Sequence, residues 1–208
     1  MQSGLVSITF RQLDRAAVVD VARQAGLAGI EWGGDVHVPP GDVEAASDAA
    51  RRTADAGLNV ASYGSYFRCT PGEAFEPVLE TAVALGAPVI RVWAGDIGSA
   101  NADADAIAET CHNITAAAAS EHIVVAAEWH GGTLTDTLDT GVALARAVNH
   151  PNFKLYWQPA RHRTFEQRRA ELEAVLPWLA HVHVFQWRDV DDGPADRRPL
   201  AEGDADWR

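Results

Sequence analysis

The sequence predicts an α/β protein of the (β/α)8 barrel type, of which seven strands and six helices are expected in this chain. Short apolar runs alternate with longer segments of helical pattern at a period of about 30 residues, which is typical of parallel βα units. Every connection between successive strands is expected to be helical. Together, the number of strands and the type of connection favour a barrel over an open sheet.

The predicted strands are short apolar runs that end at glycine, proline or polar residues. The fifth is the clearest, because Ile123–Ala127 is a continuous apolar run of the kind that is buried on both faces of a parallel sheet. In chain order, the strands are expected at residues 5–10, 27–32, 58–63, 88–93, 123–130, 152–158 and 181–187.

The predicted helices begin at capping residues and end at glycines. Asp14 and Asp42 are expected to cap the first two helices, while Gly26, Gly57 and Gly86 follow the first three. In chain order, the helices are expected at residues 14–26, 42–57, 71–86, 102–120, 133–148 and 164–179.

No eighth strand precedes Arg208, so the sequence predicts a single domain, residues 1–208, that lacks the eighth βα unit of a barrel. The first and seventh strands would then be open edges with unpaired N–H and C=O groups. We expect the native protein to continue past Arg208. The alternatives are a second chain, as in a homo-oligomer that covers the open edge, or closure of the edges into a smaller barrel.

Composition excludes several classes of protein. A net charge of −12 argues against binding to nucleic acid or to an anionic membrane. No apolar run is long enough for a transmembrane helix, and the N-terminus lacks the pattern of a signal peptide. Cys69 and Cys111 are far apart and are expected to be buried thiols, which fits a cytoplasmic protein.

Polar and aromatic side chains follow the predicted strands, where barrels place their active residues. Glu128 and His130 end the fifth strand and Gly131-Gly132 follows them; the alternative is a Glu neutralised by a nearby Arg and a His in an ordinary loop. The full set of candidates is Glu31, His37, Tyr63, Arg68, Arg91, Trp93, Asp96, Glu128, His130, Gln158, His183, Gln186 and Arg188.

Glu128, Gln158 and His183 fall on three consecutive strands and are the candidate metal ligands. A carboxylate, an amide oxygen and an imidazole suit a divalent cation such as Mn, Mg, Co or Zn. Strand alternation puts His181 on the same face as His183, so one of the two histidines is expected to be structural. For Gln158 the alternative is a hydrogen bond to a loop backbone.

Five motifs resemble the sugar phosphate isomerase/epimerase family, the xylose-isomerase-like TIM barrels. They occur in the order that the family requires and span nearly the whole chain. They are Gly29–Trp32, Arg91–Gly95, Glu128–Leu134, Tyr156–Pro159 and His181–Val184.

The resemblance implies one divalent metal ion held by a Glu, an Asp, a His and a second Glu on strands five to eight. Glu128 and His183 match two of these ligands. Gln158 stands where the Asp is usual, and the last Glu belongs to the strand that is absent. The neutral amide in place of the Asp is expected to weaken metal binding or to change the metal preference.

The expected function is that of a metal-dependent sugar isomerase or epimerase of carbohydrate metabolism, which transfers a proton next to a carbonyl through an enediolate. The resemblance implies that Glu128 both binds the metal ion and transfers the proton. His130 is the second catalytic candidate. The second acid or base would come from the absent strand, so little isomerase activity is expected of the 208-residue chain. The alternatives are a dehydratase or lyase of the same superfamily and a non-catalytic barrel that binds a sugar.

The expected partner is a small sugar substrate, held in an aromatic-walled pocket. Sugars stack their C–H faces on aromatic rings, while arginines hold polar substituents. The expected substrate-binding residues are Glu31, His37, Tyr63, Arg68, Arg91, Trp93, Trp157 and Trp187.

Overall fold

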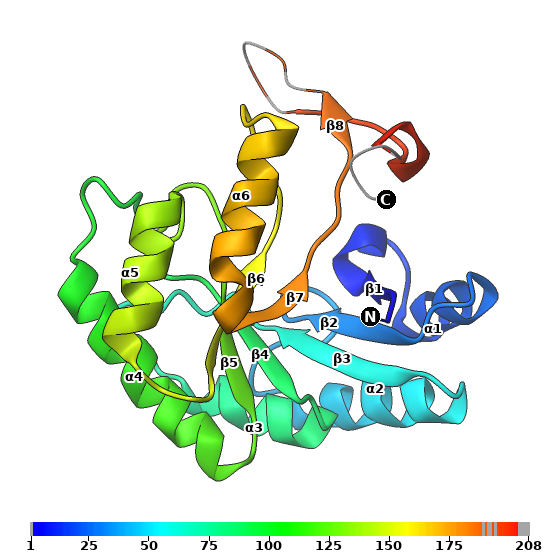
Figure 1. The fold of residues 1–208 in the computed structure, drawn as a ribbon. Helices are drawn as coiled ribbons and strands as arrows, with labels where there is room; N and C mark the ends of the chain where they lie inside the picture. The colour runs from blue at the N-terminus through cyan, green and yellow to red at the C-terminus, as the bar shows by residue number, and fades with distance from the viewer. Residues whose placement is uncertain (1, 189, 191–192, 194, 204–208) are drawn as a thin grey trace.

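The structure, a computed structural model, describes residues 2–188, 190, 193 and 195–203. Its main element is a parallel sheet of seven strands in the order β1 to β7, curled so that the helices lie around its outside (Figure 1). The predicted fold class is thereby confirmed. Asp191, Asp192 and Pro194, and the residues from 204 onward, lie outside the described residues.

Strands and α-helices alternate along the chain as predicted. The strands are β1 (Gly4–Val6), β2 (Gly29–Gly33), β3 (Asn59–Gly64), β4 (Val89–Val92), β5 (Val124–Glu128), β6 (Phe153–Trp157) and β7 (Leu179–Val182). The helices are α1 (Arg15–Gln24), α2 (Val43–Asp55), α3 (Glu76–Leu85), α4 (Ala104–Ser120), α5 (Leu138–Val148) and α6 (Phe165–Val175).

Five short elements are present in the structure but were not predicted. The first strand ends at Val6, and residues 7–10 form a 3-10 turn, η1. A second turn, η2 (Leu176–Trp178), leads directly into β7. Beyond β7, where the predicted strand continues to residue 187, the chain forms a small antiparallel hairpin of β8 (Trp187–Arg188) and β9 (Asp196–Arg197), followed by a last turn, η3 (Leu200–Gly203).

Side-chain caps fix several helix ends. The carboxylates of Asp14 and Asp42 accept hydrogen bonds from the backbone N–H of Ala17 and Ala45, which confirms both predicted caps. Helix α5 begins at Leu138, later than predicted, because Thr137 is its cap and the preceding threonines bond to the end of β5.

The core lies on both faces of the sheet. The larger cluster fills the space between strands and helices and contains Val125, Ala127 and Leu155. A smaller cluster inside the curl consists of Val89, Ala126 and Tyr156. Successive residues of a strand therefore point in turn toward the helices and toward the interior of the curl. The inward-pointing residues of the different strands meet there. Cys69 and Cys111 are buried free thiols, as predicted.

One side of the curled sheet is open. Strand β1 pairs with β2 and β7 pairs with β6, but within the described residues no strand joins β1 to β7. All residues of β2 are buried, whereas all four residues of β7 are half-buried. A cavity of about 650 Å³ lies between the two edges and reaches Glu31, Tyr156 and His183.

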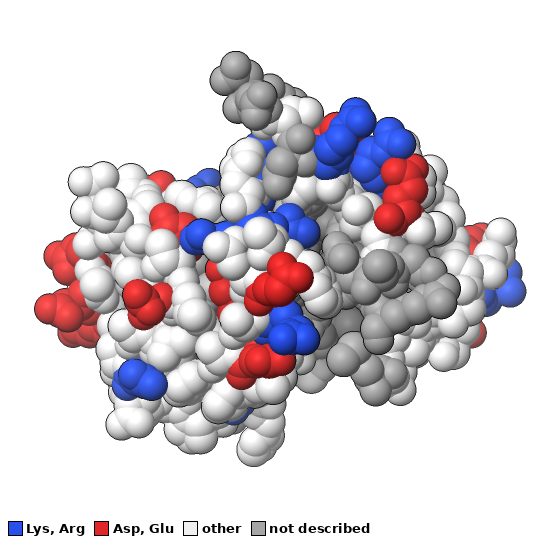
Figure 2. Space-filling model, turned by 45° about the horizontal axis from the view of Figure 1, so that its top comes forward, with Lys and Arg blue, Asp and Glu red and all other residues white. Residues whose placement is uncertain are grey.

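The surface is mixed in charge. In Figure 2 the basic side chains of the described residues lie among acidic ones. Two ion pairs near the C-terminal hairpin illustrate this, Arg188 with Asp196 at 2.8 Å and Arg198 with Glu202 at 2.8 Å. No helix of the described residues combines the length and the apolar character needed to cross a bilayer.

Candidate active site

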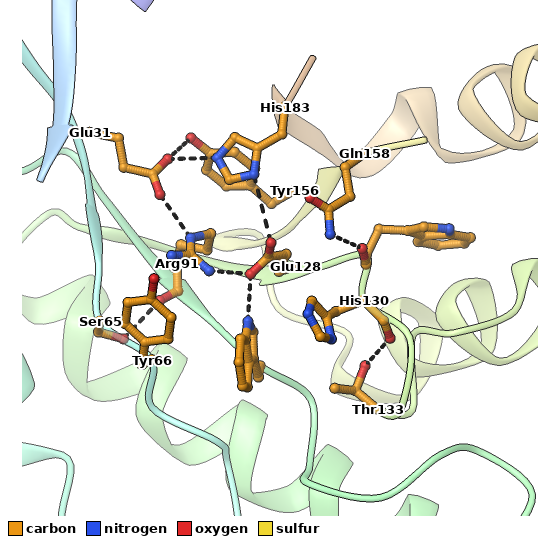
Figure 3. Close-up of polar contacts among 12 residues, drawn as sticks. Glu31, Ser65, Tyr66, Arg91, Glu128, His130, Thr133, Tyr156, Gln158 and His183 are labelled. Atoms are coloured by element: carbon orange, nitrogen blue, oxygen red, sulfur yellow. Dashed lines mark hydrogen bonds and ion pairs between the residues drawn. The ribbon is translucent and has the colours of Figure 1, made fainter. Parts of the chain in front are cut away.

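Four charged side chains meet inside the curl, at the C-terminal ends of their strands (Figure 3). Arg91 on β4 lies between two carboxylates: its Nε donates to Glu31 Oε1 at 2.8 Å, and its Nη1 donates to Glu128 Oε2. His183, just after β7, lies on the other side, with Nε2 3.0 Å from Glu31 Oε2. All four side chains are at most 8% exposed. We call them the charge network.

Glu31 is the most heavily bonded member of the charge network. Besides Arg91 and His183, it accepts hydrogen bonds from the hydroxyls of Tyr156 and Ser62, the latter at 3.0 Å. Burial alone would raise its pKa, but the charges of His183 and Arg91 outweigh burial, and the pKa lies far below its usual range. Glu31 is therefore a fixed anion that cannot accept a proton near neutral pH.

Glu128 is held in a similar way on one of its two oxygens. Oε2 accepts hydrogen bonds from Arg91 and from the indole N–H of Trp93, while Oε1 faces His183 Nδ1 at 3.7 Å. Burial raises the pKa of Glu128, but His183 and Arg91 together lower it below its usual value. Glu128 is thus a weak base, and within the described residues no hydrogen bond is formed to its Oε1.

His183 completes the charge balance. Burial would lower its pKa, but Glu31 and then Glu128 raise the pKa to about 9 in the metal-free protein. The imidazolium and Arg91 together offset the two carboxylates, so the charge network is neutral. His183 Nδ1 is buried and has no hydrogen-bond partner among the described residues, because 3.7 Å from Glu128 Oε1 is too long for a hydrogen bond.

This unpartnered nitrogen allows a test of whether the residues fit a divalent metal ion. Two ligand atoms of one tetrahedral ion are about 3.3–3.6 Å apart, close to the 3.7 Å between Glu128 Oε1 and His183 Nδ1. His183 Nε2 faces Glu31, the arrangement in which a carboxylate orients a metal-bound imidazole. The pair therefore fits two positions of a metal site. No group of three or more His, Cys, Asp or Glu side chains among the described residues forms a fuller site.

Gln158, the third predicted ligand, follows β6 beside this pair (Figure 3). Its amide nitrogen donates to the backbone carbonyl of Trp129 at 2.7 Å. This is the loop hydrogen bond that the sequence left open as an alternative. It leaves only the amide oxygen for an ion.

Three cationic or aromatic groups form a stack at the mouth of the site. The Arg68 guanidinium lies 4.6 Å from the centre of the Trp93 ring, and His130 stacks on Trp93 with ring centres 4.6 Å apart. Tyr66 packs edge-on against Trp93 at 5.5 Å. We call Arg68, Trp93 and His130 the mouth stack.

His130 has a defined tautomer. Its Nδ1 lies 2.7 Å from the carbonyl oxygen of Gly131, and a carbonyl can only accept, so Nδ1 carries the proton in this contact. In the neutral ring, Nε2 then holds the lone pair. Among the described residues no hydrogen bond engages Nε2, nor the side-chain N–H groups of Arg68.

Three residues predicted to bind substrate lie elsewhere. Trp157, 2% exposed, and Tyr63, 0% exposed, belong to the helix-facing core. The Tyr63 hydroxyl donates to the carbonyl of Val38. His37 is buried beneath a loop, with Nε2 3.1 Å from the carbonyl of Leu13. Trp157 and Tyr63 face the helices rather than the charge network, because side chains one position apart on a strand face opposite sides. The substrate-binding roles of these three residues stay predictions.

The remaining predicted aromatic residue, Trp187, lies in the hairpin. It packs on Phe185 at 5.4 Å, and Arg168 lies 5.9 Å from its ring. Phe185 in turn lies 6.1 Å from His183, so Trp187 is linked to the charge network through one intervening ring.

Tyr156 and Ser62 both reach Glu31, although neither was predicted as a site residue. Strand alternation was the available signal for Tyr156, because it lies two positions before Gln158 on the same face. His181 stacks on this Tyr156 ring at 4.8 Å, and His183 contacts the ring at 4.5 Å. Both histidines therefore lie on the inner face, as predicted.

Comparisons with known proteins agree with this architecture. A family model described as a xylose isomerase-like TIM barrel matches residues 19–208. A 3-dehydroshikimate dehydratase of Bacillus anthracis is 26% identical over 239 residues, which cover 98% of this chain and 83% of that protein.

Solved structures show the same fold at lower sequence identity. The crystal structure of the probable 3-DHS dehydratase AsbF of Bacillus anthracis, described as involved in petrobactin synthesis, matches with a TM-score of 0.78 and 24% identity, over 92% of this chain and 75% of that one. A D-psicose 3-epimerase of Clostridium cellulolyticum H10, solved with D-tagatose, matches with a TM-score of 0.70 and 14% identity, over 89% and 73% of the two chains.

Proposed function

This chain belongs to the xylose isomerase-like TIM barrel family, and on that premise we propose that it is a dehydratase. The proposed substrate is a small ring ketone that carries hydroxyl groups and a carboxylate, the chemical class of 3-dehydroshikimate. The 26% identity to a 3-dehydroshikimate dehydratase supports this choice of substrate class.

The observation that carries the proposal is the difference between the two carboxylates and His130 in their ability to accept a proton. Glu31 and Glu128 both have lowered pKa values and bind cationic donors, so neither is suited to accept a proton. His130 Nε2 has a lone pair and no partner within the described residues. Elimination of water needs one base on one face of the substrate, whereas epimerisation needs a proton donor and an acceptor on opposite faces.

The proposed reaction is a β-elimination. His130 Nε2 takes the proton from the carbon next to the carbonyl, and the C–H electrons move into the carbonyl group. They then form the new C=C bond as the C–O bond to the β-hydroxyl breaks. The departing hydroxide takes the proton back from protonated His130 Nε2 and leaves as water, which returns His130 to its starting form. In this scheme His130, rather than Glu128, is the base.

The other site residues would bind the substrate and a divalent metal ion. Arg68 presents its N–H edge at the mouth, where it would pair with the substrate carboxylate, and Trp93 would hold the His130 ring in place by stacking on it. Glu128 Oε1 and His183 Nδ1 would hold a divalent metal ion, with the Gln158 amide oxygen as a weak third ligand. When bound, such an ion polarises substrate oxygens and so favours loss of the proton.

A sugar epimerase or isomerase is the second candidate. The observation in its favour is that Glu31 and Glu128 flank Arg91 from two sides, as a pair of proton-transfer groups would. For this chemistry, one carboxylate must first lose its bonds to Arg91.

A side-by-side assay tests the proposal. Purified protein supplied with Mn²⁺ is incubated with 3-dehydroshikimate and, separately, with D-psicose and D-fructose. Loss of water from 3-dehydroshikimate yields an aromatic dihydroxybenzoate, which ultraviolet absorbance detects directly. We expect dehydration and no change in the keto-sugars. Conversion of a keto-sugar without dehydration would replace the proposal with the second candidate.

A further inference from the structure

Three successive backbone carbonyls at the end of β5 each receive a hydrogen bond from a side chain. The Thr135 hydroxyl donates to the carbonyl of Glu128 at 2.5 Å, and the Gln158 amide donates to that of Trp129 at 2.7 Å. The Thr133 hydroxyl donates to the carbonyl of His130 at 2.7 Å (Figure 3). We call Thr133, Thr135 and Gln158 the carbonyl clamp.

The carbonyl clamp lies at the point where β5 stops pairing with the neighbouring strand. The bond from Trp129 N–H to the carbonyl of Tyr156, at 2.8 Å, is made at the end of the pairing between β5 and β6. Beyond it, backbone groups lack strand partners and must find others. Thr133 is 2% exposed and Thr135 is 0% exposed, so water does not supply these bonds.

The clamp is itself attached to both neighbouring strands. Between its two threonines, Leu134 N–H donates to the carbonyl of Ala94 at 2.8 Å, just after β4. Gln158 lies just after β6. The Thr133 and Thr135 hydroxyls are 2.9 Å apart, but their two protons are already directed to carbonyls by the two shorter contacts. The ends of β4, β5 and β6 are thereby joined around Glu128 and His130.

We propose that Thr133, Thr135 and Gln158 are positioning residues, which hold the backbone so that Glu128 points at Arg91 and His130 stays stacked on Trp93 with Nε2 free. For His130, this inference rests on the proposed function. It also gives Gln158 a role that the usual Asp at this position cannot perform, because a carboxylate has no N–H to donate to a carbonyl.

Matched variants separate positioning from mere structural support. Thr133→Val removes the hydroxyl at nearly constant volume, whereas Thr133→Ser keeps it. Gln158→Glu keeps the length of the side chain but removes the N–H donor. Nitrogen-15 NMR of the His130 ring reports its tautomer without any substrate.

We expect wild type and Thr133→Ser to show one dominant tautomer, protonated at Nδ1. Thr133→Val and Gln158→Glu should show a mixture of tautomers and lose roughly ten- to a hundredfold in kcat with little change in KM, because small misplacements of a reacting group are costly. If Thr133→Val fails to fold, Gln158→Glu carries the test.

Wild-type ring spectra and kcat in Gln158→Glu or in folded Thr133→Val would overturn the inference. The NMR measurement remains a valid test of the inference even if the protein dehydrates no substrate. In that case the proposed function fails, while the positioning of His130 is still decided by the ring spectra of the variants.

Discussion

The charge network and the mouth stack lie side by side but differ in how completely their polar atoms are used. In the charge network, Arg91 bridges Glu31 and Glu128, Glu31 is bonded on both carboxylate oxygens, and both Arg91 and Glu31 are at most 3% exposed. In the mouth stack, Arg68 and His130 are held mainly by ring contacts and keep polar atoms available. The difference suits the proposed function, in which the buried charges fix the geometry and the electrostatic field of the site and the less constrained His130 imidazole transfers the proton.

The largest contrast should appear in stability. Arg91→Met leaves Glu31 and Glu128 buried without their shared cation, which should lower the free energy of unfolding by about 3–5 kcal/mol. Arg68→Met removes only a cation–π contact at the surface, worth about 0.5–1 kcal/mol. Urea unfolding of both variants measures the difference. Equal losses would mean that the two regions are not distinct.

Activity should show the opposite order. His130→Gln should reduce kcat of the dehydration by roughly 10²–10⁴-fold, as expected for loss of a general base, and should leave the urea midpoint nearly unchanged. His122→Asn is the matched control, because His122 is exposed with a φ of 60°, a conformation that Asn tolerates. A His130→Gln variant with normal kcat would remove His130 from the mechanism.

The pH dependence of stability above neutral pH should come mainly from His183 of the charge network. In metal-free protein the pKa of His183 is raised to about 9 from an ordinary value of 6.5. Its stabilising contribution is therefore complete below the unfolded-state value and is lost as the pH rises through about 9. We expect the free energy of unfolding to fall by roughly 1–3 kcal/mol across this window. Glu31, whose pKa is lowered, stays ionised there and adds nothing.

Comparison with His183→Gln isolates this effect. That variant cannot become charged and should show a much flatter profile between pH 6.5 and pH 9, the window set by His183. An unchanged slope would assign the pH dependence to another group.

The smallest expected effect concerns the metal. If the Gln158 amide oxygen is a ligand, Gln158→Asp should tighten Mn²⁺ binding about tenfold, because a carboxylate adds charge to the site. Isothermal titration calorimetry at constant pH measures this. Unchanged or weaker binding would restrict Gln158 to its bond with the Trp129 carbonyl.

The fold was predictable because each βα unit carries its own local signals. Apolar runs, caps at Asp14 and Asp42 and closing glycines define the elements without long-range information. Strand lengths were less predictable, since β1 and β7 end where tertiary contacts, not composition, change the backbone.

The site was predictable in part. Their position at strand ends was enough to predict that Glu31, Arg91 and Glu128 lie close together. It was not enough to predict which face of the sheet a neighbouring side chain points to, as Trp157 and Tyr63 show. The pairing of β2 with β3 shifts register between Ile30 and Glu31, which aligns Ser62 with Glu31. Such irregularities depend on packing between strands and leave no local trace in the sequence.

The bond from His183 to Glu31 joins residues 152 positions apart in the chain, and the bond from Tyr156 to Glu31 joins residues 125 positions apart. Contacts across such separations close the largest loops and carry the highest entropic cost during folding. The charge network should therefore assemble after the individual βα units. In refolding from urea, circular dichroism should recover before catalytic activity, and simultaneous recovery would contradict this order. A nascent chain would then acquire its chemistry only when its seventh strand is in place.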